Sequence, residues 1–247
     1  MSDGFPNVGK EHADGDFVTT RWSLVLRAGG ENTEGRRALD ELCRIYWYPL
    51  YCYVRRRGFQ HADAENFVQD FFLRLFEKDL FGQADREKGM LRSFLLKRLQ
   101  FDLVDAHRRA TAEKRGGRAE FVPLDTTGAE ERYCGEPVDT DTPEKHFERR
   151  WALTVLQRTA AALGEGWKRS GKSELFAILS PYLFTPLDAS GTQRLAAERG
   201  MTESNVKVSL HRLRDSYRTL LRSEIAETVA SESEIDAELA ALRAAVS

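Results

Sequence analysis

The chain has 247 residues, of which 41% are hydrophobic and 31% are charged, and its formal net charge is −2. This length and composition predict a soluble, mostly helical protein of one or two domains with real cores. The sequence has no apolar run of signal-peptide or membrane length, and its three cysteines form no CxxC pair, so we expect a cytoplasmic protein with free thiols.

The small net charge conceals an uneven distribution of charged residues. Residues 92–118 hold eight Lys and Arg against three acidic residues, whereas residues 223–247 hold six acidic residues and one Arg. Binding to a polyanion is therefore judged from the local distribution rather than from the total.

The first part of the chain predicts helices separated by polar breaks. Residues 1–16 are polar and rich in glycine, which is typical of disorder. We expect a short helix over 17–26 and a longer one over 38–57. Pro49 lacks a backbone N–H, so we expect it to kink that helix or to start a second one.

Residues 62–76 predict an amphipathic helix with one unusual position. Its core arc consists of Ala64, Val68, Phe71 and Leu75. Leu73 lies opposite this arc, with Gln69 and Asp70 beside it and Phe76 near Gln69. A bulky apolar residue on a polar face indicates either a partner surface or a helix buried on two sides within its own domain.

A third helix is predicted over 90–109, after a loop over 79–89. Its inner arc consists of Leu91, Leu95, Leu99, Leu103 and Ala106. A second face carries Phe94, Lys97, Phe101 and Arg108. Aromatic rings interleaved with cations suit single-stranded nucleic acid, where bases stack on rings and phosphates meet positive charge. The alternative is that these rings pack on a neighbouring helix, which we favour for Phe101 because phenylalanine is most often buried.

Residues 117–143 show no periodicity and predict a linker rich in Gly, Pro, Thr and acidic residues. Further helices are predicted over 142–162, 173–184 and 224–246, the last of them acidic. The most informative stretch lies between these helices, at residues 192–221.

Residues 192–221 predict two helices joined by a tight turn. Gly200 stands where a positive φ is wanted, and the hydroxyl of Thr202 can cap the second helix at the N–H of Asn205. One stripe of that helix is apolar: Val206, Leu210, Leu213, Tyr217, Leu220 and Leu221. A second stripe is basic and consists of Lys207, His211, Arg214 and Arg218. The outer face of the helix carries Ser204, Asn205, Lys207 and His211. The pattern favours a helix-turn-helix whose second helix enters the DNA major groove, and the alternative is a hairpin with a solvated charged face.

Motifs for catalysis and metal binding do not occur in the sequence. It contains no P-loop, GxGxxG, HExxH or GxSxG, and its five histidines have no metal-ligand spacing. We therefore expect a binding protein rather than an enzyme, with no cofactor and no metal.

Three segments, taken together and in this order, resemble bacterial RNA polymerase sigma factors of the small extracytoplasmic-function type. They are HADAENFVQDFFLRLFEK, LRSFLLKRLQFDLVDAHRRATAEKRGG and LAAERGMTESNVKVSLHRLRDSYRTLLRSEI. The resemblance covers roughly residues 17–229 and implies core RNA polymerase and promoter DNA as partners, in transcription initiation.

The resemblance also implies a role for each segment. Polymerase binding falls on the 63–76 helix, at Asp63, Gln69, Asp70, Leu73 and Phe76. Melting and reading of the minus-ten element fall on residues 81–109, at Phe94, Lys97, Arg98, Arg108 and Arg109. Reading of the minus-thirty-five element falls on Ser204, Asn205, Lys207, His211, Arg212 and Arg214.

The expected fold is all-α, with two helical domains joined by a linker, the second containing the helix-turn-helix. We expect the first domain over residues 17–116 and the second over 144–230. The linker between them is expected over 117–143, and an acidic tail over 231–247. The segment before Trp22 and the residues past Val229 exceed the minimal family pattern, so we expect a regulatory role there, and an anti-sigma factor is a further possible partner. A stand-alone helix-turn-helix regulator and an adaptor protein without a DNA role are the alternatives.

Overall fold

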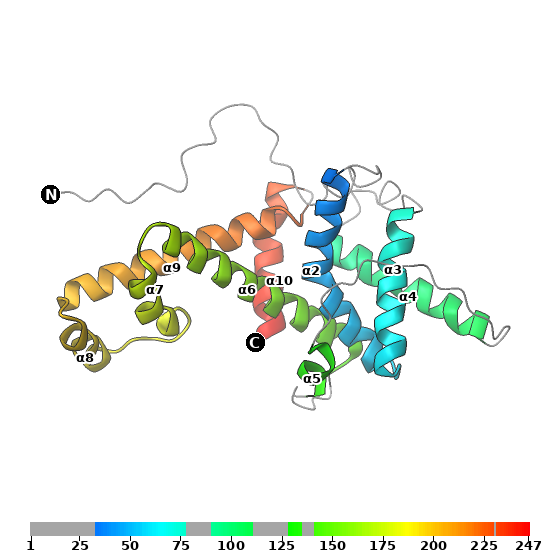
Figure 1. The fold of residues 1–247 in the computed structure, drawn as a ribbon, viewed down its shortest axis with the longest axis horizontal. Helices are drawn as coiled ribbons and strands as arrows, with labels where there is room; N and C mark the ends of the chain where they lie inside the picture. Colours follow the sequence, from blue (N-terminus) through cyan, green and yellow to red (C-terminus); the bar gives the residue numbers. More distant parts are fainter. Residues whose placement is uncertain (1–32, 78–89, 111–127, 135–140, 230) are drawn as a thin grey trace. The chain divides into compact units, whose positions relative to one another are not determined.

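The computed structural model describes residues 33–77, 90–110, 128–134, 141–229 and 231–247, and all regular elements in these ranges are helices (Figure 1). The all-α prediction is therefore confirmed for this part of the chain. The predicted helix over 17–26, the loop over 79–89 and most of the predicted linker lie outside it. In the described ranges, none of the helices combines the length and the apolar character needed to cross a membrane.

The described chain divides into two compact units at places that differ from the predicted boundaries. Unit 1 contains Leu156–Glu224, and unit 2 contains the described residues of Thr19–Val155 together with Ile225–Ser247. Both divisions fall inside helices, namely α6 (Pro143–Arg169) and α9 (Glu203–Ala226), rather than in a linker at 117–143 or a break at 230. The C-terminal helix therefore belongs with the N-terminal helices.

Unit 2 is built around α2 (Thr33–Arg56), which packs against α3 (His61–Glu77) and α4 (Leu91–Ala110). Its core is aromatic and aliphatic and includes Ile45, Tyr46, Leu50, Phe71, Phe72, Leu95, Leu99, Phe147 and Trp151. Helix α2 continues through Pro49, although proline removes one helical hydrogen bond. The buried side chains on either side of Pro49 fix both halves of the helix in the core, so no second helix starts there.

The predicted inner arcs of α3 and α4 are confirmed, except that Ala106 of α4 is only partly buried. Ala64, Val68, Phe71 and Leu75 are buried in α3, and Leu91, Leu95, Leu99 and Leu103 are buried in α4. Asp102 joins the two helices, because its carboxylate lies 3.4 Å from Arg74 of α3 and 3.0 Å from Arg98 of α4.

Helix α5 (Ala129–Cys134) lies in the stretch 117–143 that was predicted to be a linker. Glu130 ties α5 to the end of α2: it accepts a hydrogen bond from Arg55 at 2.9 Å and one from the Tyr51 hydroxyl at 2.5 Å. The Arg55 guanidinium also lies 4.8 Å from the centre of the Tyr133 ring. A helix of six residues is too short to show a period in sequence, and tertiary contacts stabilise it here.

Helix α10 (Ile235–Val246) is packed into unit 2 rather than extending from it as a tail. Ile235, Glu238 and Leu242 are its buried positions. Glu238 accepts hydrogen bonds from Arg92 of α4 at 2.8 Å and 2.9 Å, and Arg92 also pairs with Glu148 of α6. The sequence predicts a final acidic helix, and the structure has one. Its Glu238, however, is buried in the core of unit 2.

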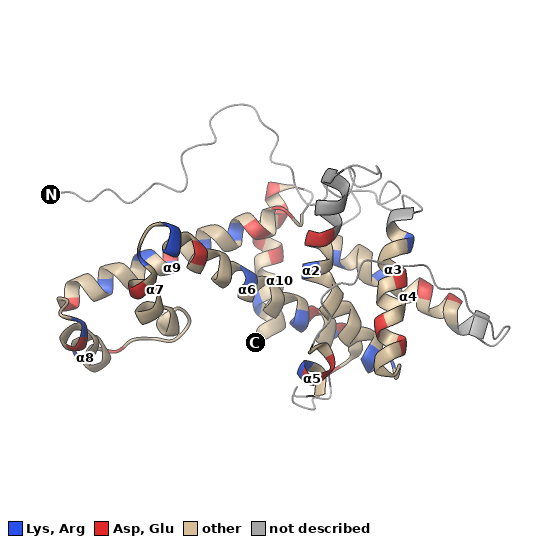
Figure 2. Cartoon of the chain, in the orientation of Figure 1, with Lys and Arg blue, Asp and Glu red and all other residues tan. Residues whose placement is uncertain are grey.

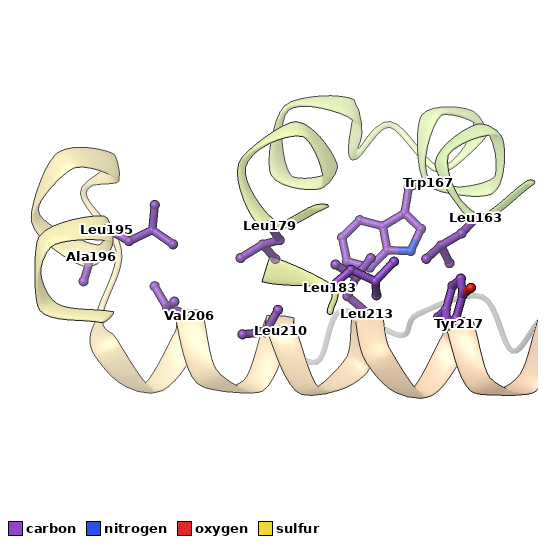
Figure 3. Close-up of a cluster of buried hydrophobic side chains, with 10 residues drawn as sticks. All are labelled: Leu163, Trp167, Leu179, Leu183, Leu195, Ala196, Val206, Leu210, Leu213 and Tyr217. Carbon is purple, nitrogen blue, oxygen red and sulfur yellow. The ribbon is translucent and has the colours of Figure 1, made fainter. Parts of the chain in front are cut away.

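Unit 1 has its own apolar core, formed by the second part of α6, α7 (Ser173–Leu179), the short helix η2 (Ser180–Tyr182), α8 (Ala189–Arg199) and α9 (Figure 3). The cluster consists of Leu163, Trp167, Leu179, Leu183, Leu195, Ala196, Val206, Leu210, Leu213 and Tyr217. Burial raises the pKa of Tyr217 to about 12, and its hydroxyl donates to the carbonyl oxygen of Leu156 at 3.2 Å.

Candidate nucleic-acid interface

Three local interactions fix the start of α8 and the turn that joins α8 to α9. Asp188 caps α8 by accepting the N–H of Gly191 at 2.7 Å. Gly200 ends α8 with φ 63°, in the left-handed region, and its N–H donates to the carbonyl of Ala196. Thr202 caps α9 by accepting the N–H of Asn205 at 3.2 Å. The predicted roles of Gly200 and Thr202 are therefore confirmed, and three residues separate the two helices.

Packing against the unit 1 core fixes which side of α9 faces solvent. Figure 3 shows Val206, Leu210, Leu213 and Tyr217 directed toward side chains of the other helices of this unit. Leu195 and Ala196 of α8 belong to the same cluster, so the two helices share one core. The opposite side of α9 is left for contacts outside the unit.

The predicted DNA-reading residues in the first turns of α9 lie on that solvent side. Ser204, Asn205, Lys207, His211 and Arg212 are all exposed. The Lys207 ammonium lies 3.9 Å from Glu203, one turn earlier. Basic residues continue along the helix with few acidic residues between them (Figure 2). These donors and cations match what base edges and phosphates require.

Arg214 has a different environment from the one predicted. Its Nη2 donates to the carbonyl oxygens of Tyr182 at 2.8 Å and Thr185 at 2.9 Å, and the side chain is partly buried. These bonds hold the segment after η2 against α9, close to Phe184, whose ring packs edge-on against Tyr217 at 5.1 Å. Arg214 therefore positions a loop of unit 1, and its guanidinium is engaged within the fold.

Sequence reasoning missed Val208, which is 44% exposed although it is apolar. It stands on the same side of α9 as Ser204 and Arg212, which are one turn before and one turn after it. The signal was present in the sequence, since Val208 falls outside the apolar stripe.

On α4 the structure separates the predicted band into exposed and partly buried residues. Phe101 is 69% exposed, so the interpretation of this ring as core is wrong. Lys97 and Val104 are exposed beside it, whereas Phe94 and Arg98 are partly buried. The backbone of α4 includes Arg108 and Arg109, but their side chains lie outside the described part of the structure.

On α3 the predicted polymerase-binding residues also differ in exposure. Asp63 and Asp70 are exposed, whereas Gln69 and Leu73 are partly buried. The side chain of Phe76 is outside the described part. The partial burial of Leu73 does not decide between a partner surface and a helix buried on two sides. Part of its side chain is accessible, on a face of α3 that carries exposed carboxylates.

The candidate residues form separate surfaces on separate helices. Those of α3 and α4 belong to unit 2, and those of α9 belong to unit 1. Among the described residues, no group of His, Cys, Asp and Glu could hold a metal ion. None of the three cysteines, all of which lie in the described ranges, forms a disulfide, and burial raises the pKa of the Cys43 thiol well above its ordinary value.

Comparison of the chain with protein-family models, with curated proteins and with solved structures finds no match.

Proposed function

We propose that this chain is a sigma factor, which binds core RNA polymerase and directs it to a set of promoters. The observation that carries the proposal is the solvent side of α9, where Ser204, Asn205, Lys207, His211 and Arg212 stand exposed after a capped turn. A second helix presented in this way after a short turn is the arrangement that enters the major groove in helix-turn-helix proteins.

Unit 2 supports the same proposal through a second surface. Phe101 and Lys97 expose an aromatic ring and a cation on one face of α4, opposite the buried leucines. This pairing suits an opened DNA strand, because bases stack on rings of any sequence and phosphates meet positive charge. The exposed acidic face of α3, with Leu73 partly accessible on it, supplies the surface for the polymerase.

The direct test is transcription in vitro with purified core polymerase and genomic DNA of the source organism. We expect discrete transcripts that start at defined positions only when the chain is added. A chain that binds DNA with the same specificity alone as with polymerase would instead be a stand-alone regulator. Such regulators usually dimerise to contact two half-sites, so mass measurement in solution separates the two outcomes further.

Lys207→Ala examines the role of α9 within this experiment. Loss of one phosphate contact lowers the slope of log affinity against log salt by about 1, and weakens binding at all sequences alike. Glu203→Ala is the matched control, because it removes the acidic neighbour of Lys207 and leaves the cation in place. An unchanged salt slope for Lys207→Ala would remove this residue from the DNA surface.

A further inference from the structure

Val208 lies at the centre of the solvent side of α9. It follows buried Val206 by two residues and precedes buried Leu210 by two, and each step turns the helix by about 100°. Val208 therefore points about 160° away from both. Figure 3 shows Val206 and Leu210 on the side of α9 that meets the core, so Val208 is directed to the opposite side.

The neighbours of Val208 on this side are polar and charged. Ser204 precedes it by one turn, and His211 and Arg212 follow it by one turn, all of them exposed. Asp215 comes next along the same line, with its side chain 70% exposed. The turns between Glu203 and Asp215 carry no acidic residue, so this is the part of α9 that phosphates can approach without repulsion. Val208 stands in the middle of that part.

We propose that Val208 makes the recognition helix specific for thymine at one position of its DNA element, by contact with the 5-methyl group. This inference rests on the proposed function and adds the identity of one base. Within the major groove, hydrogen-bonding groups mark every base pair, and the thymine methyl is the apolar group that side chains contact. A valine side chain has no donor or acceptor, so the methyl is the feature it can select.

The polar neighbours make this contact selective. Ser204, Asn205, His211 and Arg212 supply donors and acceptors for the flanking base edges. A cytosine opposite Val208 would bring its amino group against an isopropyl group and lose a hydrogen bond to water. Thymine places a methyl there and excludes water from both apolar groups.

The first experiment identifies the element. A pool of random-sequence duplex DNA is selected with the full chain bound to core polymerase, and the selection is repeated with Val208→Ala. We expect one position that is thymine with the native chain and relaxed with the variant. Failure to enrich any sequence would overturn the proposed function and this inference with it. An element whose base preferences are identical for both proteins would overturn this inference alone.

The second experiment isolates the methyl group. Each thymine of the element is replaced in turn by uracil, which lacks only the 5-methyl. At one position we expect the native chain to lose about fourfold in affinity, since burial of one methyl group contributes that much. Val208→Ala should bind both duplexes alike, while Val208→Thr, which keeps one methyl, should retain part of the discrimination. Equal loss for the native chain and Val208→Ala at every thymine would refute the contact.

Discussion

The guanidinium of Arg92 donates to both carboxylate oxygens of Glu238, at 2.8 Å and 2.9 Å, across a separation of 146 residues. Glu238 is fully buried, and the same guanidinium lies 4.8 Å from the centre of the Trp151 ring and also pairs with Glu148. Burial by itself lowers the pKa of Arg92, but the two carboxylates outweigh this effect and raise it. One cation thus joins α4, α6 and α10.

Arg92→Ala should be among the most destabilising substitutions in unit 2. It leaves the Glu238 carboxylate buried without its partner, which costs about 3–5 kcal/mol of unfolding free energy. Glu238→Gln should cost less, because the amide still accepts a hydrogen bond. Urea unfolding at neutral pH measures both, and Asp236→Asn, an exposed change on the same helix, is the control. Unfolding of Arg92→Ala at the native urea midpoint would show that α10 is not held by this pair.

The contact between α5 and α2 should depend on pH through Glu130. The hydrogen bond from Tyr51 is the main reason that the pKa of Glu130 is lowered, with help from Cys134 and Arg55. A lowered pKa in the folded state contributes stability above the ordinary carboxyl value of about 4.3, and that contribution is lost as pH falls through the folded value.

Glu130→Gln should therefore be less stable than the native chain at neutral pH, and the gap should close as pH falls below about 4. Urea midpoints of the two proteins, measured side by side across this range, provide the comparison. Glu131→Gln, at the exposed neighbouring position, controls for the loss of a negative charge. A gap that widens in acid would contradict the sign of the Glu130 contribution.

Arg214 should affect stability rather than salt dependence. Its two bonds to Tyr182 and Thr185 are lost in Arg214→Ala, and hydrogen bonds from a charged group contribute about 1.5–3 kcal/mol. Arg214→Lys should restore part of the native value, because both bonds come from one nitrogen and an ammonium can also donate to two carbonyl oxygens. Thermal unfolding measures the loss, and the salt slope of DNA binding should stay native. If Arg214→Ala lowered the salt slope of DNA binding and kept the native thermal midpoint, Arg214 would instead be a DNA-contacting residue.

Phe101→Ala should weaken the binding of single-stranded DNA by polymerase-bound chain without unfolding unit 2. Stacking of a base on a ring contributes about 1–3 kcal/mol, whereas an exposed ring contributes little to the core. Val104→Ala is the matched control, since Val104 is 48% exposed on the same helix and carries no ring. Permanganate reactivity of promoter thymines reports strand opening. Equal opening by Phe101→Ala and the native chain would leave Phe101 without a role in it.

Leu73→Arg should separate polymerase binding from folding. Because Leu73 is only partly buried, its side chain can reach solvent, and we expect a smaller fall in thermal midpoint than for Leu75→Arg at a buried position. An arginine placed in a desolvated interface costs several kcal/mol, which we expect as a loss of affinity for core polymerase. If Leu73→Arg bound core polymerase with native affinity, the polymerase-docking surface would not include Leu73.

Periodicity in sequence predicted the parts of this fold whose stability comes from an amphipathic face. The arcs through Val68 and Leu75, and the capped turn at Gly200 and Thr202, follow from local spacing and local hydrogen bonds. Arg214 could not be predicted in this way. Its position in a basic stripe resembles that of Lys207, and only the path of the chain brings two carbonyls to it.

The same limit explains α5 and α10. Glu130 and Glu238 look like ordinary surface acids in sequence, because acidic residues are rarely buried without a partner. Their partners Arg55 and Arg92 lie 75 and 146 residues earlier in the chain. The prediction for Phe101 was wrong for the opposite reason. A phenylalanine side chain is expected in the core, but its position on α4 leaves it exposed to solvent.

The order in which the chain is synthesised gives the buried position of Glu238 a further consequence. Arg92 leaves the ribosome 146 residues before its partner, a delay of roughly 7–30 s at elongation rates of about 5–20 residues per second. Throughout this interval, Leu156–Glu224 is made and can fold, while unit 2 still lacks α10. The unit that begins first is therefore completed last. A nascent chain from which Leu156–Glu224 has just emerged would carry a complete unit 1 and a unit 2 that still lacks α10.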